Sequence, residues 1–320
     1  IAAHEPAELM LLSHDENSIF ELANDLRIRN VNLVIKTLVA NIQDEQRLED
    51  LFAKHRPDVI FHAAAHKHVP LMEEHPTEAV RNNIGGTRNL IRLARDHGAA
   101  RFVNISTDKA VHPTNVMGAT KHVAEMLIRD AARMAPDRDF VNVRFGNVLG
   151  SRGSVIPTWE QQIAHGGPVT LTHEDMTRYF MLIPEAVQLV LQAAVFGGKG
   201  TTYVLDMGDP VRIKDMAEQL IRLHGHVPGK DIQIMTTGLR PGEKMFEELL
   251  LDPSHISHSP HEKILIEGQV PMPNELDEII DVLQASARAG DEAAVRNQLQ
   301  ALVPGAQLQV PKPNQELEAR

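Results

Sequence analysis

The fold is decided by the stretch Phe102-Val103-Asn104-Ile105-Ser106-Thr107-Asp108-Lys109 and by the helical pattern that follows it from about Asn115 to Met134. Phe102 to Ile105 is a short apolar run with the length of a buried strand. Val59-Ile60-Phe61 and Val141 to Phe145 have the same character, and helical spacing lies between them. Strands that alternate with helices predict a parallel sheet covered by helices on both faces.

The same alternation extends outward from this stretch. We expect further strands at Leu9–Leu12, Val31–Val39, Val169–Thr172, Tyr203–Leu205 and Ile232–Met235, and helices at Ser18–Arg29, Asp44–Lys54, Ala79–Ala94, Glu185–Val195 and Ile213–Leu223. The sequence thus predicts an α/β, Rossmann-like doubly wound parallel sheet with a smaller C-terminal substrate lobe. The expected domains are a dinucleotide-binding domain at 1–150, a lobe at 151–270 interleaved with returns to the sheet, and a helical and disordered tail at 271–320. Disorder is expected from Pro304 onward.

Composition excludes several classes of function. The net charge is −11, from 32 basic and 43 acidic residues, which argues against a sequence-independent grip on nucleic acid. The chain has no Cys, so disulfides, thiolate catalysis and Cys-based zinc sites are excluded. No apolar run approaches the ~20 residues needed to span a bilayer. The longest one, around Val187 to Phe196, is interrupted by Gln188 and Gln192.

An acid and two amines are placed to share one pocket. Asp108 and Lys109 follow the strand Phe102–Ile105, and Lys121 follows on the next helix, on the same face as Met117. An isolated Asp-Lys pair is usually solvated. This pair, however, is expected at the carboxyl ends of the parallel strands, where ligands bind in such sheets. Many dinucleotide enzymes carry Tyr four residues before this Lys, whereas Met117 cannot transfer a proton. A lysine base would need its pKa lowered from ~10.4 by burial or by a neighbouring cation.

Other motifs are consistent with a phosphate-bearing, flat ligand. Ala63, Ala64 and Ala65 let a ring approach the backbone, and Lys67 can meet a phosphate. His66 and His68 lack a third ligand at suitable spacing, so we expect no metal. Gly85 and Gly86 interrupt a helical pattern at a cost of ~1 kcal/mol each, which indicates close packing or function.

Two more motifs each admit an ordinary interpretation. The run from Arg144 to Ser151 ends a strand with Gly and Asn, which is also typical of a simple turn. Leu239 to Lys244 is a turn that we expect to open a helix. Arg240 suits a phosphate and Glu243 a sugar hydroxyl, but an acidic residue is favoured at a helix start in any case.

Together these motifs resemble the extended short-chain dehydrogenase/reductase family. More closely, they resemble its nucleotide-sugar 4,6-dehydratases of the CapD-like polysaccharide biosynthesis family, from Ile1 to about Ile266. The methionine at position 117 makes the chain resemble the membrane-anchored branch of that family, in which transmembrane helices precede a catalytic domain of this kind. The resemblance implies a homo-oligomer and a cytoplasmic location. A membrane anchor upstream of Ile1, which would hold the domain at the inner face of the membrane, stays open.

The resemblance also implies ligands and the residues that hold them. The cofactor is NAD, with NADP left open because Ser13 stands where an acidic residue often holds the adenosine ribose. The substrate is a UDP-sugar. The cofactor-binding residues implied are Ser13, Asn41, Ile42, Ala63, Ala64, Ala65, Ser106 and Lys121. The substrate-binding residues implied are Lys67, Asn83, Asn147, Arg178, Arg240 and Glu243.

The implied reaction is that of a UDP-N-acetylglucosamine-type 4,6-dehydratase, which gives a UDP-4-keto-6-deoxy sugar for capsule, O-antigen or glycan biosynthesis. In this scheme Lys109 is the base at C5 and Asp108 the acid at the C6 hydroxyl. Thr107 positions the C4 hydroxyl, whose proton goes to water or Asp108 because Met117 cannot take it. Lys121 holds the nicotinamide ribose. A 4-epimerase, a C5-inverting variant and a non-catalytic nucleotide-sugar-binding fragment remain alternatives.

The family's first strand and its Gly-x-x-Gly-x-x-Gly loop have no counterpart in these 320 residues. Ile1 falls inside the family's first helix, so Ile1 to Pro6 is expected to be the end of a helix. The first strand of such a sheet lies between the second and the fourth. We therefore expect an unpaired edge on each of those strands, weak NAD binding by residues 1–320 alone and a tendency to aggregate.

Overall fold

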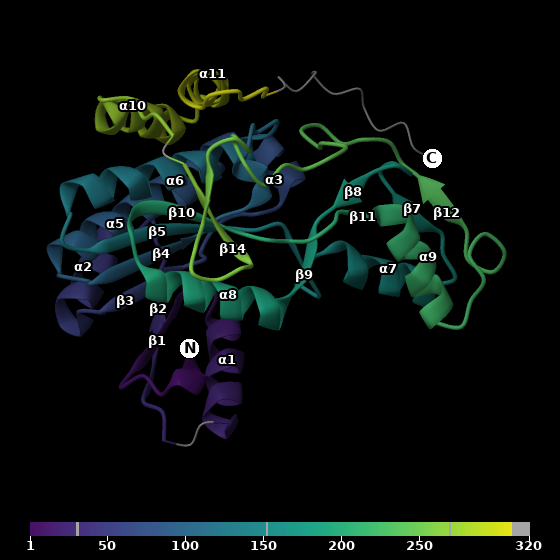
Figure 1. Ribbon diagram of the computed structural model, residues 1–320, viewed down its shortest axis with the longest axis horizontal. Helices are drawn as coiled ribbons and strands as arrows, with labels where there is room; N and C mark the ends of the chain where they lie inside the picture. Colours follow the sequence, from purple (N-terminus) through teal and green to yellow (C-terminus); the bar gives the residue numbers. More distant parts are fainter. Residues whose placement is uncertain (30–31, 152, 269, 309–320) are drawn as a thin grey trace.

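The computed structural model describes residues 1–29, 32–151, 153–268 and 270–308, and its centre is a six-stranded sheet with the order β13-β14-β10-β5-β4-β3. Strands β3 (Val59–His62), β4 (Arg101–Ile105), β5 (Asp139–Arg144) and β10 (Lys199–Leu205) run parallel. Strands β14 (Ile264–Glu267) and β13 (Ile256–His258) extend the sheet in antiparallel pairs. The predicted Rossmann-like α/β fold is confirmed (Figure 1).

A second, two-stranded sheet holds β1 (Leu9–Ser13) parallel to β2 (Ile35–Val39), with α1 (Glu16–Arg29) between them in the chain. In Figure 1 these elements lie together below the six-stranded sheet. Within the described ranges, β1 pairs with β2 alone and β3 with β4 alone. Among the described residues, strands β1 and β3 therefore each have one free edge, and the family's first strand is expected to lie between these two edges. The expected start of the second strand, Val31, lies outside the described residues. Ala2–His4 form a single 3-10 turn.

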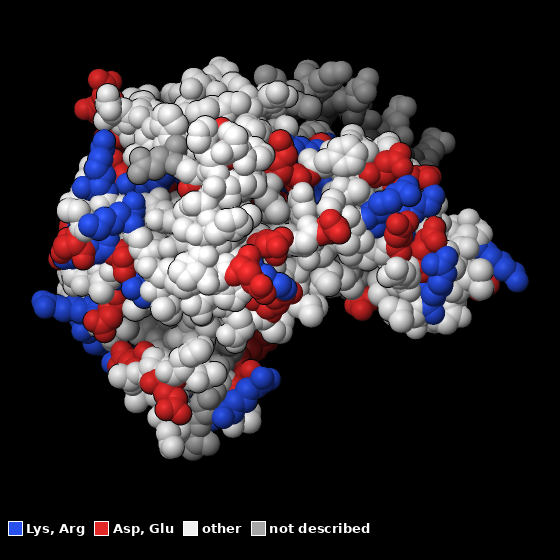
Figure 2. Space-filling view, in the orientation of Figure 1, with Lys and Arg blue, Asp and Glu red and all other residues white. Residues whose placement is uncertain are grey.

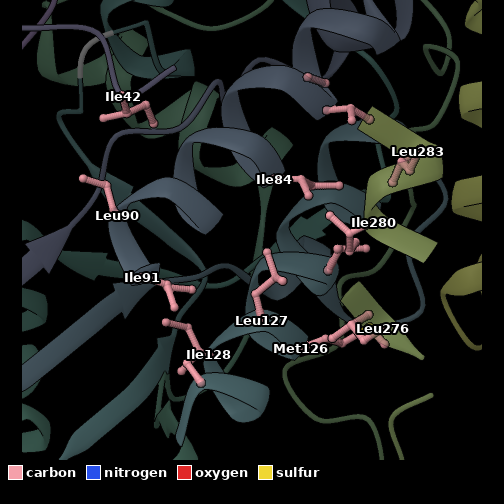
Figure 3. Close-up of a cluster of buried hydrophobic side chains, with 14 of the residues drawn as sticks. Ile42, Ile84, Leu90, Ile91, Met126, Leu127, Ile128, Leu276, Ile280 and Leu283 are labelled. Carbon is pink, nitrogen blue, oxygen red and sulfur yellow. The ribbon is translucent and has the colours of Figure 1, made fainter. Parts of the chain in front are cut away.

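Both faces of the central sheet are buried because neighbouring residues along each strand point to opposite sides. On one side, Phe102 and Phe140 pack against α2 (Glu45–His55), α5 (Thr87–Asp96) and α6 (Val116–Met134). On the other side, Val103 and Val141 pack against α8 (Ile183–Phe196). Figure 3 shows Ile84, Ile91, Met126, Leu127 and Ile128 meeting between the helices. Helix α6 is buried along most of its length, which explains its apolar sequence.

Helices α3 (Val69–Glu74) and α4 (Pro76–Ala79) lead into a π-helical segment, Val80–Gly86, which continues as α5. A Cβ atom on Gly86 would lie 2.4 Å from Cδ1 of Ile42, so close packing accounts for this glycine. A Cβ atom on Gly85 would meet its nearest neighbour, the Gln284 side chain, at an ordinary 3.5 Å. The expected reason for a helical glycine therefore applies to Gly86.

The smaller lobe has its own core around Trp159. It contains α7 (Val155–Ala164) and α9 (Ile213–Leu223), with β7 (Val169–Leu171) parallel to β12 (Ile234–Thr236). Two short pairs connect it to the sheet: β6 (Asn147–Leu149) with β9 (Phe180–Leu182), and β8 (Thr177–Arg178) with β11 (Val211–Arg212). Strands β10 and β14 lie in the central sheet, so the chain returns to it twice.

The expected helix after the turn at Arg240 is wrong, because residues 241–250 form turns and bends. Three carbonyls of this segment accept from buried arginine side chains. Arg178 donates to the carbonyls of Lys244 and Met245 at 2.8 and 3.1 Å. Arg144 donates to the carbonyl of Leu249 at 3.0 Å. A helix would need those carbonyls for its own hydrogen bonds.

Helices α10 (Leu276–Ala289) and α11 (Glu292–Leu302) form a pair that packs over α4 and α6 (Figure 1, yellow). Disorder was expected from Pro304, but Ala306 is buried and the amide of Gln307 donates to the carbonyl of Pro113 at 2.9 Å. The rest of the expected disordered tail, 309–320, lies outside the described residues. In the parts of the chain that the structure describes, no helix has the length and apolar character to cross a membrane. On the face in Figure 2, basic side chains lie among acidic ones, without a continuous basic stripe.

Candidate active site

A cavity of about 530 Å³ lies between the carboxyl ends of the parallel strands and the smaller lobe. Its wall is built by residues that follow β3, β4 and β5, by the start of α6, and by the lobe. The cavity therefore lies where the sheet topology predicts a ligand. The predicted site residues that line it are Ala63, Ala65, Lys67, Ser106, Thr107, Lys109, Met117, Lys121, Asn147, Arg178, Arg240 and Glu243.

The residues after β4 form a 3-10 turn, Asp108–Ala110, that presents an ion pair to the cavity. Lys109 Nζ lies 3.0 Å from Asp108 Oδ1 and 3.2 Å from Asn147 Oδ1. Thr107 Oγ1 donates to the same Asp108 oxygen at 2.8 Å. The Asp108 carboxylate lies behind Lys109, fully buried, and its Oδ2 atom has no hydrogen-bond partner in the described structure. Lys109 thus faces the cavity, with an acid directly behind its amine.

The electrostatics of Lys109 differ from the expectation. Burial by itself lowers the pKa of Lys109, but the carboxylates of Asp108 and Glu247 outweigh burial and raise this pKa. The lowered pKa that a resting lysine base would need is therefore absent from Lys109. The amine with a lowered pKa is Lys121: burial brings its pKa to about 8, although Glu125 opposes the shift.

Helix α6 is fixed at its first turn by contacts from three directions. Asn115 caps the helix, since its Oδ1 accepts from the amide of Gly118 at 2.7 Å. Glu73 Oε1 accepts from the amide of Val116 at 2.6 Å, and Glu73 Oε2 accepts from Arg296 of α11 at 2.8 Å. These bonds hold the start of α6, from which Met117 and Lys121 project.

Met117 and Lys121 lie one helical turn apart on the cavity side of α6. Lys121 Nζ donates to the carbonyl of Ile105 at 2.6 Å, so the amine lies beside the end of β4. Met117 is 3% exposed and belongs to the helical core as well as to the cavity wall. The position that carries a tyrosine in many dinucleotide enzymes therefore does reach the site here, without a group that can carry a proton.

The turn at Arg240 closes the opposite wall. The carbonyl of Gly242 accepts from Thr114 Oγ1 at 2.9 Å and from Asn115 Nδ2 at 3.0 Å, so the turn is tied to the start of α6. Glu243 Oε2 accepts from the amide of Arg240 at 3.1 Å. In contrast, the guanidinium of Arg178 donates to carbonyl oxygens, including those of Lys244 and Met245. Its contacts make Arg178 a support for this segment.

Several predicted residues do not line the cavity. Asn83 is buried, and its amide bonds to the backbone of His66 and to Thr120 Oγ1, so it holds the loop beside Lys67 and does not face a ligand. Ile42 is part of the helical core. Ser13, Asn41 and Ala64 also fall outside the cavity wall, as does Asp108, which lies behind Lys109. The expected adenine and ribose contacts are thus separate from the cavity.

Sequence reasoning missed Glu247. Its side chain is 4% exposed, and its Oε1 atom lies 3.8 Å from Lys109 Nζ and 3.8 Å from Arg178 Nε. Burial raises the pKa of Glu247, and Asp108 adds to the rise, whereas Lys109 and Arg178 oppose it. The only sequence signal for Glu247 was its position a few residues after Arg240. The adjacent Glu248 has the same signal, so the sequence does not tell the two apart.

The fold and the position of the cavity place the chain in the short-chain dehydrogenase/reductase class. A family model described as polysaccharide biosynthesis protein matches residues 1–269. The chain belongs to that family. Helices α10 and α11 lie beyond the matched range.

Relatives of the chain include two with names in the same field. The probable polysaccharide biosynthesis protein EpsC of Bacillus subtilis is 53% identical over 251 residues, which are 78% of this chain and 42% of EpsC. The capsular polysaccharide biosynthesis protein CapD of Staphylococcus aureus is 51% identical over the same shares of each chain. The chain thus spans less than half the length of these relatives. A UDP-glucose 4-epimerase of Rickettsia prowazekii is 36% identical, over 76% of this chain and 69% of the epimerase.

Among solved structures, Pen from Bacillus thuringiensis is similar with a TM-score of 0.75 and 34% identity, over 86% of this chain and 83% of Pen. DesIV from Streptomyces venezuelae, a dTDP-glucose 4,6-dehydratase solved with NAD and TYD bound, has a TM-score of 0.65 and 20% identity, over 92% and 91% of the two chains. The likeness to DesIV shows the fold alone.

Proposed function

We propose that the chain is the catalytic part of an NAD-dependent 4,6-dehydratase that acts on a UDP-N-acetylglucosamine-type sugar. The observation that carries this proposal is the Asp108–Lys109 pair at the cavity wall, with a separation of 3.0 Å between amine and carboxylate. An acid and a base next to each other suit the removal of a proton and a hydroxyl from adjacent carbons. Met117 is compatible with the same reaction, because Lys109 and Asp108 would carry out the elimination and water can take the C4 proton that Met117 cannot.

The residues present fit the nicotinamide end of a dinucleotide. Ala63 and Ala65 leave room for a flat ring at the end of β3, and Lys121 Nζ is fixed beside β4, where it can donate to a ribose hydroxyl. Bound NAD would supply the transient oxidation of the sugar at C4. The chain's own residues would then transfer the protons.

The pair can reach its reactive form without gaining or losing a proton. If one proton moves from Lys109 Nζ to Asp108 Oδ1, the amine becomes a base and the carboxyl group an acid. Burial lowers the cost of this uncharged form because it penalises charges, although the carboxylates of Asp108 and Glu247 keep the resting Lys109 charged. Lys109 then takes the proton from C5 of the 4-keto sugar, and Asp108 gives its proton to the departing C6 hydroxyl, which leaves as water. A water molecule takes the proton released from the C4 hydroxyl and passes it to Asp108 after the C6 hydroxyl has left, and Lys109 returns its proton to C5.

The far wall of the cavity suits the diphosphate and the nucleoside. Arg240 lines the cavity and can donate two parallel hydrogen bonds to phosphate oxygens. Lys67 adds a second positive group, and burial lowers its pKa. Glu243 accepts from the backbone of its own turn through Oε2, which leaves the other oxygen of its carboxylate to accept from a ribose hydroxyl.

A UDP-sugar 4-epimerase is the second candidate, because the Rickettsia relative carries that name. An epimerase keeps the C6 hydroxyl, whereas a dehydratase loses it as water. Incubation with UDP-N-acetylglucosamine in deuterated water separates the two. We expect a UDP-4-keto-6-deoxy product with deuterium at C5, seen by NMR. A 4-epimer with no deuterium at C5 would favour the epimerase, and sugar binding without turnover would favour a non-catalytic binding protein.

The base assignment is tested with Lys109→Ala. Loss of a general base typically lowers the rate by ~10²–10⁴-fold. Because proton removal is a transition-state role, the dissociation constant for UDP should stay near the wild-type value. Lys230→Ala, which removes an exposed lysine in the lobe, is the matched control and should keep full activity. Near-normal turnover by Lys109→Ala would contradict the assignment.

A further inference from the structure

A second carboxylate lies behind the ion pair and has no place in the proton transfers just described. Glu247 comes from the segment after the Arg240 turn, and its Oε1 atom is equally distant, at 3.8 Å, from Lys109 Nζ and Arg178 Nε. Its side chain is 4% exposed and forms no part of the cavity wall. Its Oε2 atom is buried and has no hydrogen-bond partner among the described residues.

The charged groups around Glu247 come from three elements. Lys109 and Asp108 belong to the 3-10 turn after β4, Arg178 belongs to β8, and Lys244 lies on Glu247's own segment. Lys109 in turn faces Asp108, Glu247 and Arg178. The buried cluster at the cavity therefore holds two carboxylates, Asp108 and Glu247, against the two cations Lys109 and Arg178.

We propose that Glu247 is a positioning residue that holds the Lys109 amine at the cavity wall and supplies a fixed negative charge to it. The inference rests on the proposed function, in which Lys109 is the base. Asp108 cannot supply this charge throughout the reaction, because it carries a proton while Lys109 is neutral. Arg178 lies 3.8 Å from Glu247 in both forms of the pair and opposes the effect of burial on its pKa, which favours the charged carboxylate.

The geometry explains why a fixed charge belongs at this position. When the Asp108–Lys109 pair is uncharged, Glu247 still has Arg178 as its partner. When Lys109 gains the C5 proton, the new ammonium lies at contact distance from Glu247. A buried charge is costly without a counter-charge, so Glu247 stabilises the state in which Lys109 has just become charged.

The charge on Lys109 can be measured without turnover. Trace acetylation with acetic anhydride modifies only neutral amines, and peptide mass spectrometry gives the rate at Lys109 across a pH series. An opposite charge within about 4–6 Å shifts a pKa by ~1 unit or more, so Glu247→Gln should lower the pKa of Lys109. In the pH range where wild-type Lys109 is charged, acetic anhydride should then acetylate Lys109 about tenfold faster in this variant. The acidic limb of kcat/KM should move to lower pH, while the dissociation constant for UDP stays unchanged.

Glu248→Gln is the matched control. Glu248 is adjacent in sequence but 53% exposed, and its contacts are with Lys244 and His112 instead of Lys109. Its removal should leave acetylation of Lys109 at the wild-type rate. Glu247→Asp keeps the charge but withdraws it by one methylene group, so acetylation should rise by less than in Glu247→Gln.

Wild-type acetylation rates in folded Glu247→Gln would overturn the inference, and so would rates raised equally by Glu248→Gln. If Glu247→Gln does not fold, an unchanged rate in Glu247→Asp overturns it. Failure of the proposed function has a different signature, because the wild-type enzyme would then give no 4-keto-6-deoxy product. The acetylation series still decides the role of Glu247 in that case.

Discussion

Replacing Gly118 with Ala tests whether the start of α6 sets the position of the ion pair. A Cβ atom on Gly118 would lie 2.1 Å from the carbonyl oxygen of Lys109 and 3.0 Å from its carbonyl carbon. Carbon and oxygen need about 3.3 Å even in a close contact. The helix and the 3-10 turn would therefore have to separate by roughly 1 Å. Because the atom that must move belongs to the backbone, no side-chain rotation relieves this clash.

A shift of this size acts directly on Lys109. The amine bonds to Asn147 at 3.2 Å, on a different strand, so moving the turn lengthens that bond. A misplacement of about 1 Å at a catalytic group costs ~10²-fold in rate, which corresponds to ~2.7 kcal/mol in activation free energy. Overpacking lowers the free energy of unfolding by ~1–3 kcal/mol, partly offset by the better helix propensity of Ala.

Steady-state kinetics and urea unfolding of Gly118→Ala and Gly85→Ala form a matched test. Both glycines are helical, but a Cβ atom on Gly85 meets nothing closer than 3.5 Å. Gly85→Ala should keep wild-type kcat and gain ~0.5–1 kcal/mol in unfolding free energy. Gly118→Ala should lose activity. Wild-type kcat and stability in Gly118→Ala would show that the turn is not held against α6 as described.

Further variants probe the other parts of the site. Arg144→Ala leaves two buried glutamates without their shared cation, so urea unfolding should show a loss of about 3–5 kcal/mol. The pKa of Lys121 is about 8 in the folded chain, against 10.5 for an ordinary lysine. The unfolded chain therefore binds more protons between these pH values, and stability rises with pH across them. Lys121→Met lacks that rise, which is worth about 3 kcal/mol, and equal slopes in the two proteins would contradict the shift. Arg240→Ala should weaken UDP binding by roughly 1.5–3 kcal/mol in calorimetry, and an unchanged affinity would confine Arg240 to its turn. Met117→Tyr should stay folded by circular dichroism with an altered rate, and an unfolded variant would show that the core role of Met117 dominates.

Much of the site could be predicted because parallel strands end at one edge of the sheet. Thr107, Lys109 and Asn147 follow β4 and β5, so any correct strand assignment brings them together. Lys121 follows from helical spacing after Met117. The turn at Arg240 was also predicted correctly. The helix expected after it was not found, since carbonyls of this segment accept from Arg178 and Arg144.

The role of Glu247 could not be predicted from the sequence. Glu247 and Glu248 are neighbours of the same type, and only packing buries one at 4% exposure and leaves the other at 53%. The role of Asn83 was likewise hidden. Its residue type suits a ligand, whereas its hydrogen bonds to the backbone of His66 and to Thr120 depend on contacts across the fold. Sequence patterns locate an edge of the sheet more readily than they identify what lies one layer behind it.

The bond from Arg296 to Glu73 has a consequence for how the protein is made. The two residues are 223 positions apart. At the ~5–20 residues per second of protein synthesis, roughly 10–45 s pass between the emergence of Glu73 and that of Arg296. During this interval Glu73 can accept the amide of Val116 but lacks its cation. The first turn of α6, and with it the active site, should therefore become protected late, which hydrogen exchange on arrested nascent chains can follow. The helices that lie outside the family match would then be the last elements to stabilise the site.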